Sequence, residues 1–133
     1  MDKSKQPGIS FEGIILAKEK FWRDYTVPEE AVSDISISVK YNNEENNWAT
    51  EFLFSLRLVY QEKDVLTLEC VFVGFFSIIE GEENMDIERF VKNNSPALMF
   101  PYIREHVSTI TQKAGIKPVL LAPVNVIAML EDA

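Results

Sequence analysis

The chain has 133 residues, of which 21 are acidic and 13 are basic, so its net charge at pH 7 is −8. This length predicts one domain with a real core, and 47% hydrophobic residues beside 26% charged ones exclude a disordered or fibrous chain. The acidic balance, with a pI near 4.7, argues against non-specific binding to nucleic acid or to an anionic membrane, because phosphate groups need a basic face.

The rarest residue types limit the chemistry further. The single cysteine, Cys70, cannot form an internal disulfide, and the single histidine, His106, leaves no room for a histidine-rich metal site. Residues 1–8 form a polar tail with no apolar segment behind it, so no secretory signal is expected, and no apolar run reaches the roughly 18 residues that span a bilayer. We therefore expect a cytoplasmic protein with a disordered tail over 1–8 and one domain over 9–133.

Four segments have the composition of β-strands. Between Ile35 and Tyr41 apolar and polar residues alternate, as in a strand with one wet face. Similar segments run over 9–25, 48–61 and 65–79, and the irregular apolar pattern of the first predicts a bulge or bend. Polar turns at 42–47 and 61–64 separate neighbouring strands, so we expect antiparallel pairing.

Helical signals follow the strands. Residues 80–94 read as an acidic loop with one helical turn near 86–92. Ser95 is a candidate N-cap with Pro96 at the first helical position, and Pro101 should kink the helix. Gly115 is the expected C-cap, and the apolar stripe between these ends is formed by Met99, Ile103, Val107, Ile110 and Ala114. With a short last helix over 126–131, capped by Asn125, the prediction is an α+β fold: a four-stranded antiparallel sheet, a long kinked helix and a short C-terminal helix.

One or two helices can cover only one face of such a sheet. The segment 65–79 nevertheless carries apolar residues on both sides, which would leave a large apolar patch uncovered. We expect a second copy or another protein to cover that face. The alternative is that the N-terminal strand or its connection wraps around it.

Signatures of catalysis are nearly absent from the sequence. Only 5 glycines occur and none are clustered, so no phosphate-binding loop is visible. Arg104, Glu105 and His106 point about 100° apart on a helix, which favours solvated surface over a shared site. Cys70 could pair with His106 as nucleophile and base, but its place in the middle of a strand favours a buried structural thiol. We expect no enzyme activity, no cofactor and no metal.

The aromatic residues are more informative. Phe21, Trp22 and Tyr25 cluster at the end of the first strand, and Phe72, Phe75 and Phe76 form a second cluster in the segment 65–79. At least half of these side chains should belong to the core. The others could form an apolar groove that takes non-native polypeptide, since non-directional burial tolerates many sequences. An apolar small molecule is the remaining alternative for such a groove.

Three linked motifs then resemble one family. The sequence FPYIRE at 100–105, preceded by NSPAL at 94–98, resembles the FPYxRE helix of the SecB export chaperones. The segments AGIKP at 114–118 and LAPVN at 121–125 are similar to that family's continuation, and GFFSI at 74–78 is similar to its GxFSI strand end. The agreement in order and spacing covers about residues 65–130.

The resemblance implies an ATP-independent holdase that keeps preproteins unfolded and passes them to the SecA motor. It implies assembly as a dimer of dimers through the first strand and the long helix. The implied client groove has Trp22, Tyr25 and Val27 on one wall and Ile127 and Leu130 on the other. An acidic patch on the sheet would dock the motor, with Glu69 and Glu19 at matching positions.

Some positions depart from the family pattern. Arg23 stands where the family has an acidic residue near the end of the first strand, which weakens the expectation of motor docking. The segment Asn125–Val126 lacks the usual phenylalanine. A SecB-like chaperone dedicated to one partner, such as the antitoxin of a toxin–antitoxin system, is therefore the alternative function.

Overall fold

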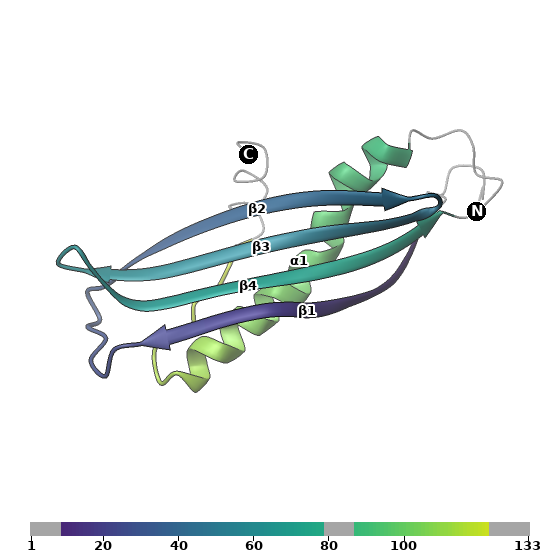
Figure 1. Cartoon of the computed structure of the whole chain (residues 1–133). Coiled ribbons are helices and arrows are strands. Elements are labelled where there is room, and N and C mark those ends of the chain that lie inside the picture. Colours follow the sequence, from purple (N-terminus) through teal and green to yellow (C-terminus); the bar gives the residue numbers. More distant parts are fainter. Residues whose placement is uncertain (1–8, 79–86, 123–133) are drawn as a thin grey trace.

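The computed structural model describes residues 9–78 and 87–122, which form four long strands and one helix (Figure 1). The strands are β1 (Ile9–Arg23), β2 (Val32–Glu44), β3 (Asn47–Tyr60) and β4 (Lys63–Ile78), and the helix is α1 (Ile87–Lys113). All neighbouring strands are antiparallel, in the order β1-β4-β3-β2. The predicted α+β class is confirmed, whereas the expected C-terminal helix lies outside the described residues.

Tight turns join the consecutive strands β2, β3 and β4. Glu45 (φ 55°) stands in the first turn, and Gln61 (φ 50°) and Glu62 (φ 63°) form the second. Left-handed backbone of this kind matches the twist of two-residue hairpin turns. The strands therefore extend further into the predicted polar turns than the sequence pattern indicated.

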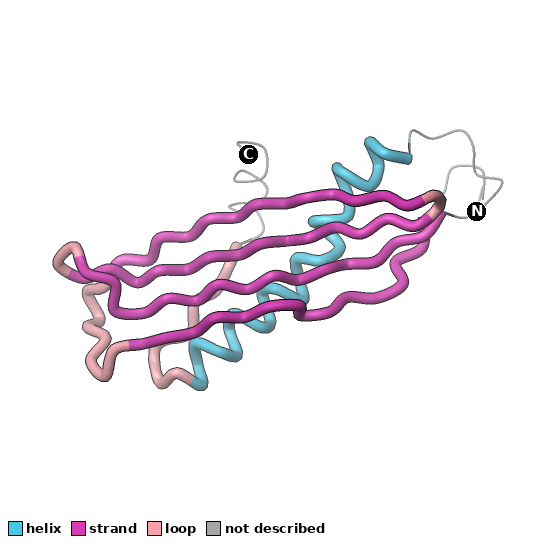
Figure 2. Tube along the Cα trace, in the orientation of Figure 1, coloured by secondary structure: helices cyan, strands magenta, loops and turns pink. Residues whose placement is uncertain are grey.

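The first strand joins the sheet differently. β1 pairs with β4 at one edge of the sheet, and residues 24–31 then carry the chain around the end of the sheet to β2 at the other edge (Figure 2). The pairing of β1 with β4 shifts register between Phe11 and Gly13 and again between Leu16 and Lys18. These two irregularities confirm the bulge that the apolar pattern of this segment predicted.

The core lies between one face of the sheet and α1, which crosses the strands diagonally (Figure 1). Alternate residues of β3 and β4 are buried there, from Trp48 to Leu58 and from Leu66 to Phe76. From the helix, Met99, Ile103 and Val107 are fully buried, as the predicted stripe requires. The opposite face of the sheet has no described element over it, so its apolar side chains are at most partly covered.

The predicted start of the helix was wrong. The helix begins at Ile87, and Ser95 lies buried inside it with its Oγ 2.8 Å from Oγ1 of Thr50 on β3. Pro96 cannot donate to the carbonyl four residues back, which belongs to Lys92. The Tyr41 hydroxyl donates to that carbonyl at 3.0 Å. The Tyr41 hydroxyl of β2 therefore takes the place of the hydrogen bond that Pro96 removes. The helix continues through Pro96, although the sequence around this proline is typical of a helix start.

The predicted end of the helix is confirmed. Gly115 adopts φ 76°, its N–H donates to the carbonyl of Gln112, and the N–H of Ile116 donates to the carbonyl of Thr111. This pair of bonds is the Schellman motif, which needs a left-handed residue, usually glycine. Thr111 also accepts a bond from the N–H of Val119 at 3.0 Å, which holds the following segment against the helix.

Candidate functional site

A groove lies between the crossover, which is the connection from β1 to β2 over residues 24–31, and residues 115–120, which follow the helix. It has a volume of about 770 Å³. Val27 and Ala31 contribute to one side, Leu58 lies at its base in β3, and Ile116 and Val119 come from the segment after the helix. The lining also includes the charged residues Arg23, Glu29 and Lys117, so the groove suits an extended ligand that carries both apolar and polar groups.

Arg23 fixes the parts of this groove to one another. Its guanidinium donates to the carbonyls of Asp24 and Tyr25, both at 2.8 Å, and to the carbonyl of Ala114 at the end of α1. A cation is favourable there because the last carbonyls of a helix lack partners and carry partial negative charge. The basic residue that departs from the family pattern therefore ties the end of β1, the crossover and the end of the helix together.

The predicted aromatic wall is divided between two sides of the sheet. Phe21 pairs with Leu68 and faces the helix side, whereas Trp22 pairs with Thr67 and faces the other side. Tyr25 is fully exposed in the crossover, and Val27 lines the groove. The two residues proposed for the opposite wall, Ile127 and Leu130, lie outside the described residues.

Two neighbouring phenylalanines of β4 have different environments. Phe76 is only 2% exposed and stacks on Phe11 with ring centroids 4.9 Å apart, so it belongs to the core. Phe75 points to the opposite face and is 40% exposed, near the exposed Ile15 of β1. Of this pair, only Phe75 is available to a partner.

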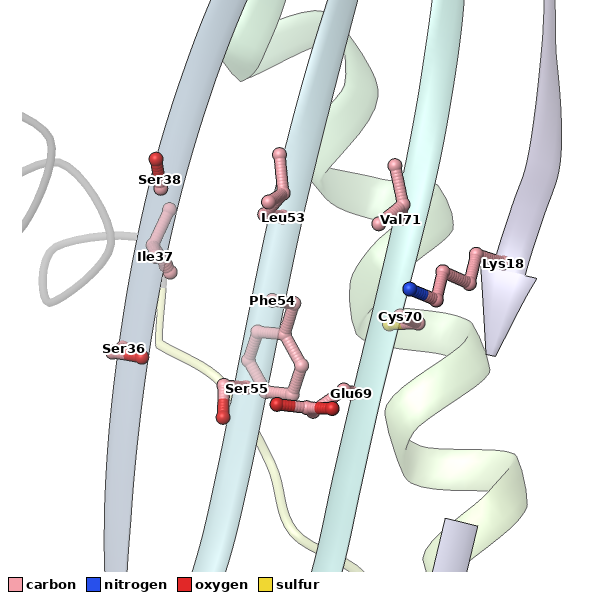
Figure 3. A pocket seen from close by; sticks show the side chains of 10 residues that line it. All are labelled: Lys18, Ser36, Ile37, Ser38, Leu53, Phe54, Ser55, Glu69, Cys70 and Val71. Carbon is pink, nitrogen blue, oxygen red and sulfur yellow. The ribbon is translucent and has the colours of Figure 1, made fainter. Parts of the chain in front are cut away.

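A shallow hollow of about 380 Å³ lies on the uncovered sheet face (Figure 3). Its exposed lining combines the small side chains Ser36, Ser38 and Ser55 with apolar Leu53 and Val71, and the charged groups of Lys18 and Glu69. Small serines of β2 and β3 stand there beside the longer side chains of Lys18 on β1 and Glu69 on β4.

The two predicted acidic docking residues lie on opposite faces of the sheet. Glu69 is exposed on the uncovered face, where it pairs with Lys20 in register. Glu19 pairs with Cys70 on the helix side, and its carboxylate contacts Nε2 of His106. His106 also packs its ring edge-on against Phe72, so it is not the purely solvated residue that the sequence suggested.

The geometry offers little to catalysis. Burial raises the pKa of the Cys70 thiol to about 12, so the thiol remains protonated and unreactive at neutral pH. Among residues 9–78 and 87–122, no cluster of three or more His, Cys, Asp or Glu side chains could hold a metal ion. Within the same ranges, no helix is both long and apolar enough to cross a membrane.

Sequence reasoning missed the segment that follows the helix. Leu120 is 70% exposed and Val119 is half-buried, and both line the groove. Their sequence reads only as an extended connection, because nothing local shows that Thr111 holds Val119 against the helix. The proline at 118 was the one available signal, since it keeps the segment extended.

Comparisons with known proteins identify one family. The family model described as preprotein translocase subunit SecB matches residues 8–133. A protein-export protein SecB of Anaplasma phagocytophilum is 28% identical over 92% of this chain and 84% of its own length. An uncharacterized protein of Methanocaldococcus jannaschii is 36% identical over 74% of this chain, and the match spans 64% of that protein, slightly less than two thirds.

A solved structure has the same fold. It is the SecB-like chaperone of Mycobacterium tuberculosis in complex with a peptide from the HigA1 antitoxin, which superposes with a TM-score of 0.72 at 17% identity, covering 86% of this chain and 88% of that one. The fold and surface therefore define a four-stranded antiparallel sheet with one long helix on one face and a groove beside the end of that helix. The chain belongs to the SecB family, as the family model over nearly its whole length shows.

Proposed function

We propose that this protein is an ATP-independent holdase that binds unfolded preproteins in apolar grooves and hands them to the Sec export machinery. The observation that carries the proposal is the groove of about 770 Å³ beside Tyr25, a fully exposed aromatic residue. Burial of apolar client segments there would contribute about 25 cal/mol per Å² without requiring a particular sequence. The client surface comprises the exposed or groove-lining members of the predicted set: Phe21, Trp22, Tyr25, Val27 and Phe75, with Ile127 and Leu130 proposed from the resemblance.

A direct test measures the aggregation of a reduced, carboxymethylated protein that cannot refold. We expect the wild-type chain to suppress aggregation at near-stoichiometric ratios without nucleotide. Tyr25→Ser should weaken capture several-fold, because it removes an exposed aromatic anchor beside the groove. Ile15→Ser is the matched control, since Ile15 is also an exposed apolar residue but lies in the middle of β1, on the uncovered face of the sheet and away from the groove. An absence of suppression at a several-fold excess would contradict the holdase function.

Handover requires docking of the SecA motor, and the acidic residues proposed for this are Glu69 and Glu19. Glu69 is the stronger candidate because its carboxylate is exposed on the uncovered sheet face. We expect Glu69→Gln to weaken binding of SecA while leaving client capture unchanged. Self-association as a dimer of dimers belongs to the same proposal and is supported by exposed apolar side chains along β1 and α1.

A second candidate function is a chaperone dedicated to one antitoxin. It is favoured by the similar fold of the Mycobacterium tuberculosis chaperone that binds an antitoxin peptide. A dedicated chaperone would capture one partner tightly in a pull-down and bind a carboxymethylated model client weakly. Capture of many unrelated unfolded proteins would contradict this alternative.

A further inference from the structure

The two edges of the sheet are protected to different degrees. β1 has two breaks in its register, and its Glu19 and Arg23 are bound to the helix. β2 instead pairs with β3 continuously over its 13 residues, with no bulge. It contains no proline, and its one lysine is Lys40. Natural proteins guard free edges with bulges, prolines and lysines, so β2 is the edge left open to another strand.

The hairpin turn determines which main-chain groups of β2 are free. The two-residue turn makes Glu44 and Asn47 its closing, hydrogen-bonded pair. Because bonded and non-bonded pairs alternate along an antiparallel ladder, the even-numbered residues of β2 bond to β3. The N–H and C=O groups of Ile35, Ile37 and Val39 therefore point away from the sheet.

The side chains of these same residues point toward the core. Ile35, Ile37 and Val39 pack against the buried cluster but remain half-buried, because no described strand lies beyond them. A strand added at this edge would place every second side chain beside them and bury apolar surface. Its main chain would be recognised without regard to sequence.

The edge is continuous with the groove. Ser33, the second residue of β2, lines the groove together with Leu58, Ala31 and Val27. An extended polypeptide that leaves the groove at Ser33 therefore meets the free edge of β2.

We propose that an unfolded client segment pairs with the free edge of β2 as an added strand, extending from the groove that holds its apolar side chains. This binding mode rests on the proposed holdase function and specifies it. The client is favoured over a second copy of the chain, because the free edge begins at Ser33, which also lines the groove proposed to hold client.

Hydrogen exchange measured by NMR on the full chain provides the first test. The outward amides of Ile35, Ile37 and Val39 should exchange rapidly in the free protein and become protected at least about tenfold when a carboxymethylated client is bound, because each gains a main-chain bond. The amides of the neighbouring Ser36 and Ser38 bond to β3 in both states and serve as internal references.

A pair of variants at Ile37 provides the second test. Ile37→Pro removes an outward N–H without removing a bond to β3, a position at which an edge strand tolerates proline. Ile37→Ala removes the side chain but keeps the donor, so it is the matched control. We expect the proline variant to bind client several-fold more weakly than the alanine variant. A short peptide alternating valine and lysine should lose at least about tenfold in affinity when every second amide is N-methylated, which tests the same bonds without altering the protein.

The outcomes separate this inference from the holdase function. If client binds but the β2 amides stay unprotected and N-methylation has no effect, the added strand is wrong while the holdase function stands. If no client binds, both fail. If the β2 amides are already protected without client, in a species of twice the monomer mass, a second copy occupies the edge and the inference is overturned.

Discussion

Gly74 shows how one residue sets the distance between the helix and the sheet. A Cβ at this position would lie 2.8 Å from Sδ and 3.0 Å from Cγ of Met99, which is fully buried. The glycine in the middle of a strand predicted either a bulge or a close approach. The β3–β4 register at Gly74 is regular, so this glycine marks a close approach of the helix to the sheet and not a bulge.

Gly74→Ala should lower the free energy of unfolding by about 1–3 kcal/mol, because the added methyl group overpacks the core against Met99. Gly13→Ala is the control, since a Cβ there meets no atom within 4 Å. Urea unfolding of both variants measures the difference. Equal midpoints for the two variants would show that Met99 adapts without cost.

At the scale of elements, the helix illustrates what local sequence can and cannot reveal. Alternation predicted the strands, and the stripe of Met99, Ile103 and Val107 predicted the buried face, because burial imposes these periods directly. The start of the helix could not be predicted, because Ser95 followed by Pro96 has the local chemistry of a cap. The contacts that override this reading come from strands some fifty residues earlier in the chain.

Tyr41→Phe tests that explanation. The change removes the hydroxyl that donates to the carbonyl of Lys92, which Pro96 cannot satisfy from within the helix. We expect a loss of about 0.5–1.5 kcal/mol in the free energy of unfolding, the range for one hydrogen bond, because the bond is exposed and water can bind the carbonyl in its place. Far-ultraviolet circular dichroism should also show loss of helix N-terminal to Pro96.

The control for this variant is Tyr60→Phe on the neighbouring strand. Tyr60 is also half-buried, and its hydroxyl forms no hydrogen bond with another residue in the ranges 9–78 and 87–122. The Tyr60→Phe variant should therefore unfold at the same urea concentration as the wild type. If both tyrosine variants lose the same stability, the hydroxyl of Tyr41 has no special role in continuing the helix.

At the scale of the whole molecule, the candidate site was predicted only in part. The sequence indicated that the sheet carries more apolar surface than one helix can cover, and the structure places exposed apolar side chains on both sides of it. In β1 the side of the sheet that a residue faces depends on the bulges, because each bulge reverses the alternation of side chains between the two faces. After the shift at Gly13, Ile15 points away from α1 and Leu16 points toward the helix side.

This pair of neighbours separates two ways of assembling. Leu16 is 42% exposed on the side of β1 where Phe21 and, from the helix, Leu98 and Tyr102 also expose apolar surface. If copies associate through β1 and α1, as proposed, Leu16 is buried in the contact and Ile15 is not. Sedimentation of the wild type should then give a multiple of the 15.2 kDa chain mass.

Leu16→Asp should shift that mass toward a single copy, because a buried carboxylate without a partner costs several kcal/mol. Ile15→Asp introduces the same charge one residue away, on the uncovered sheet face, and should leave the mass unchanged. The opposite pattern would move the contact to the uncovered face, where Phe75 and Ile15 are exposed. A wild-type chain that sediments as a single copy at micromolar concentration would remove the need for either contact, and the apolar surface on both sides would then be free for clients.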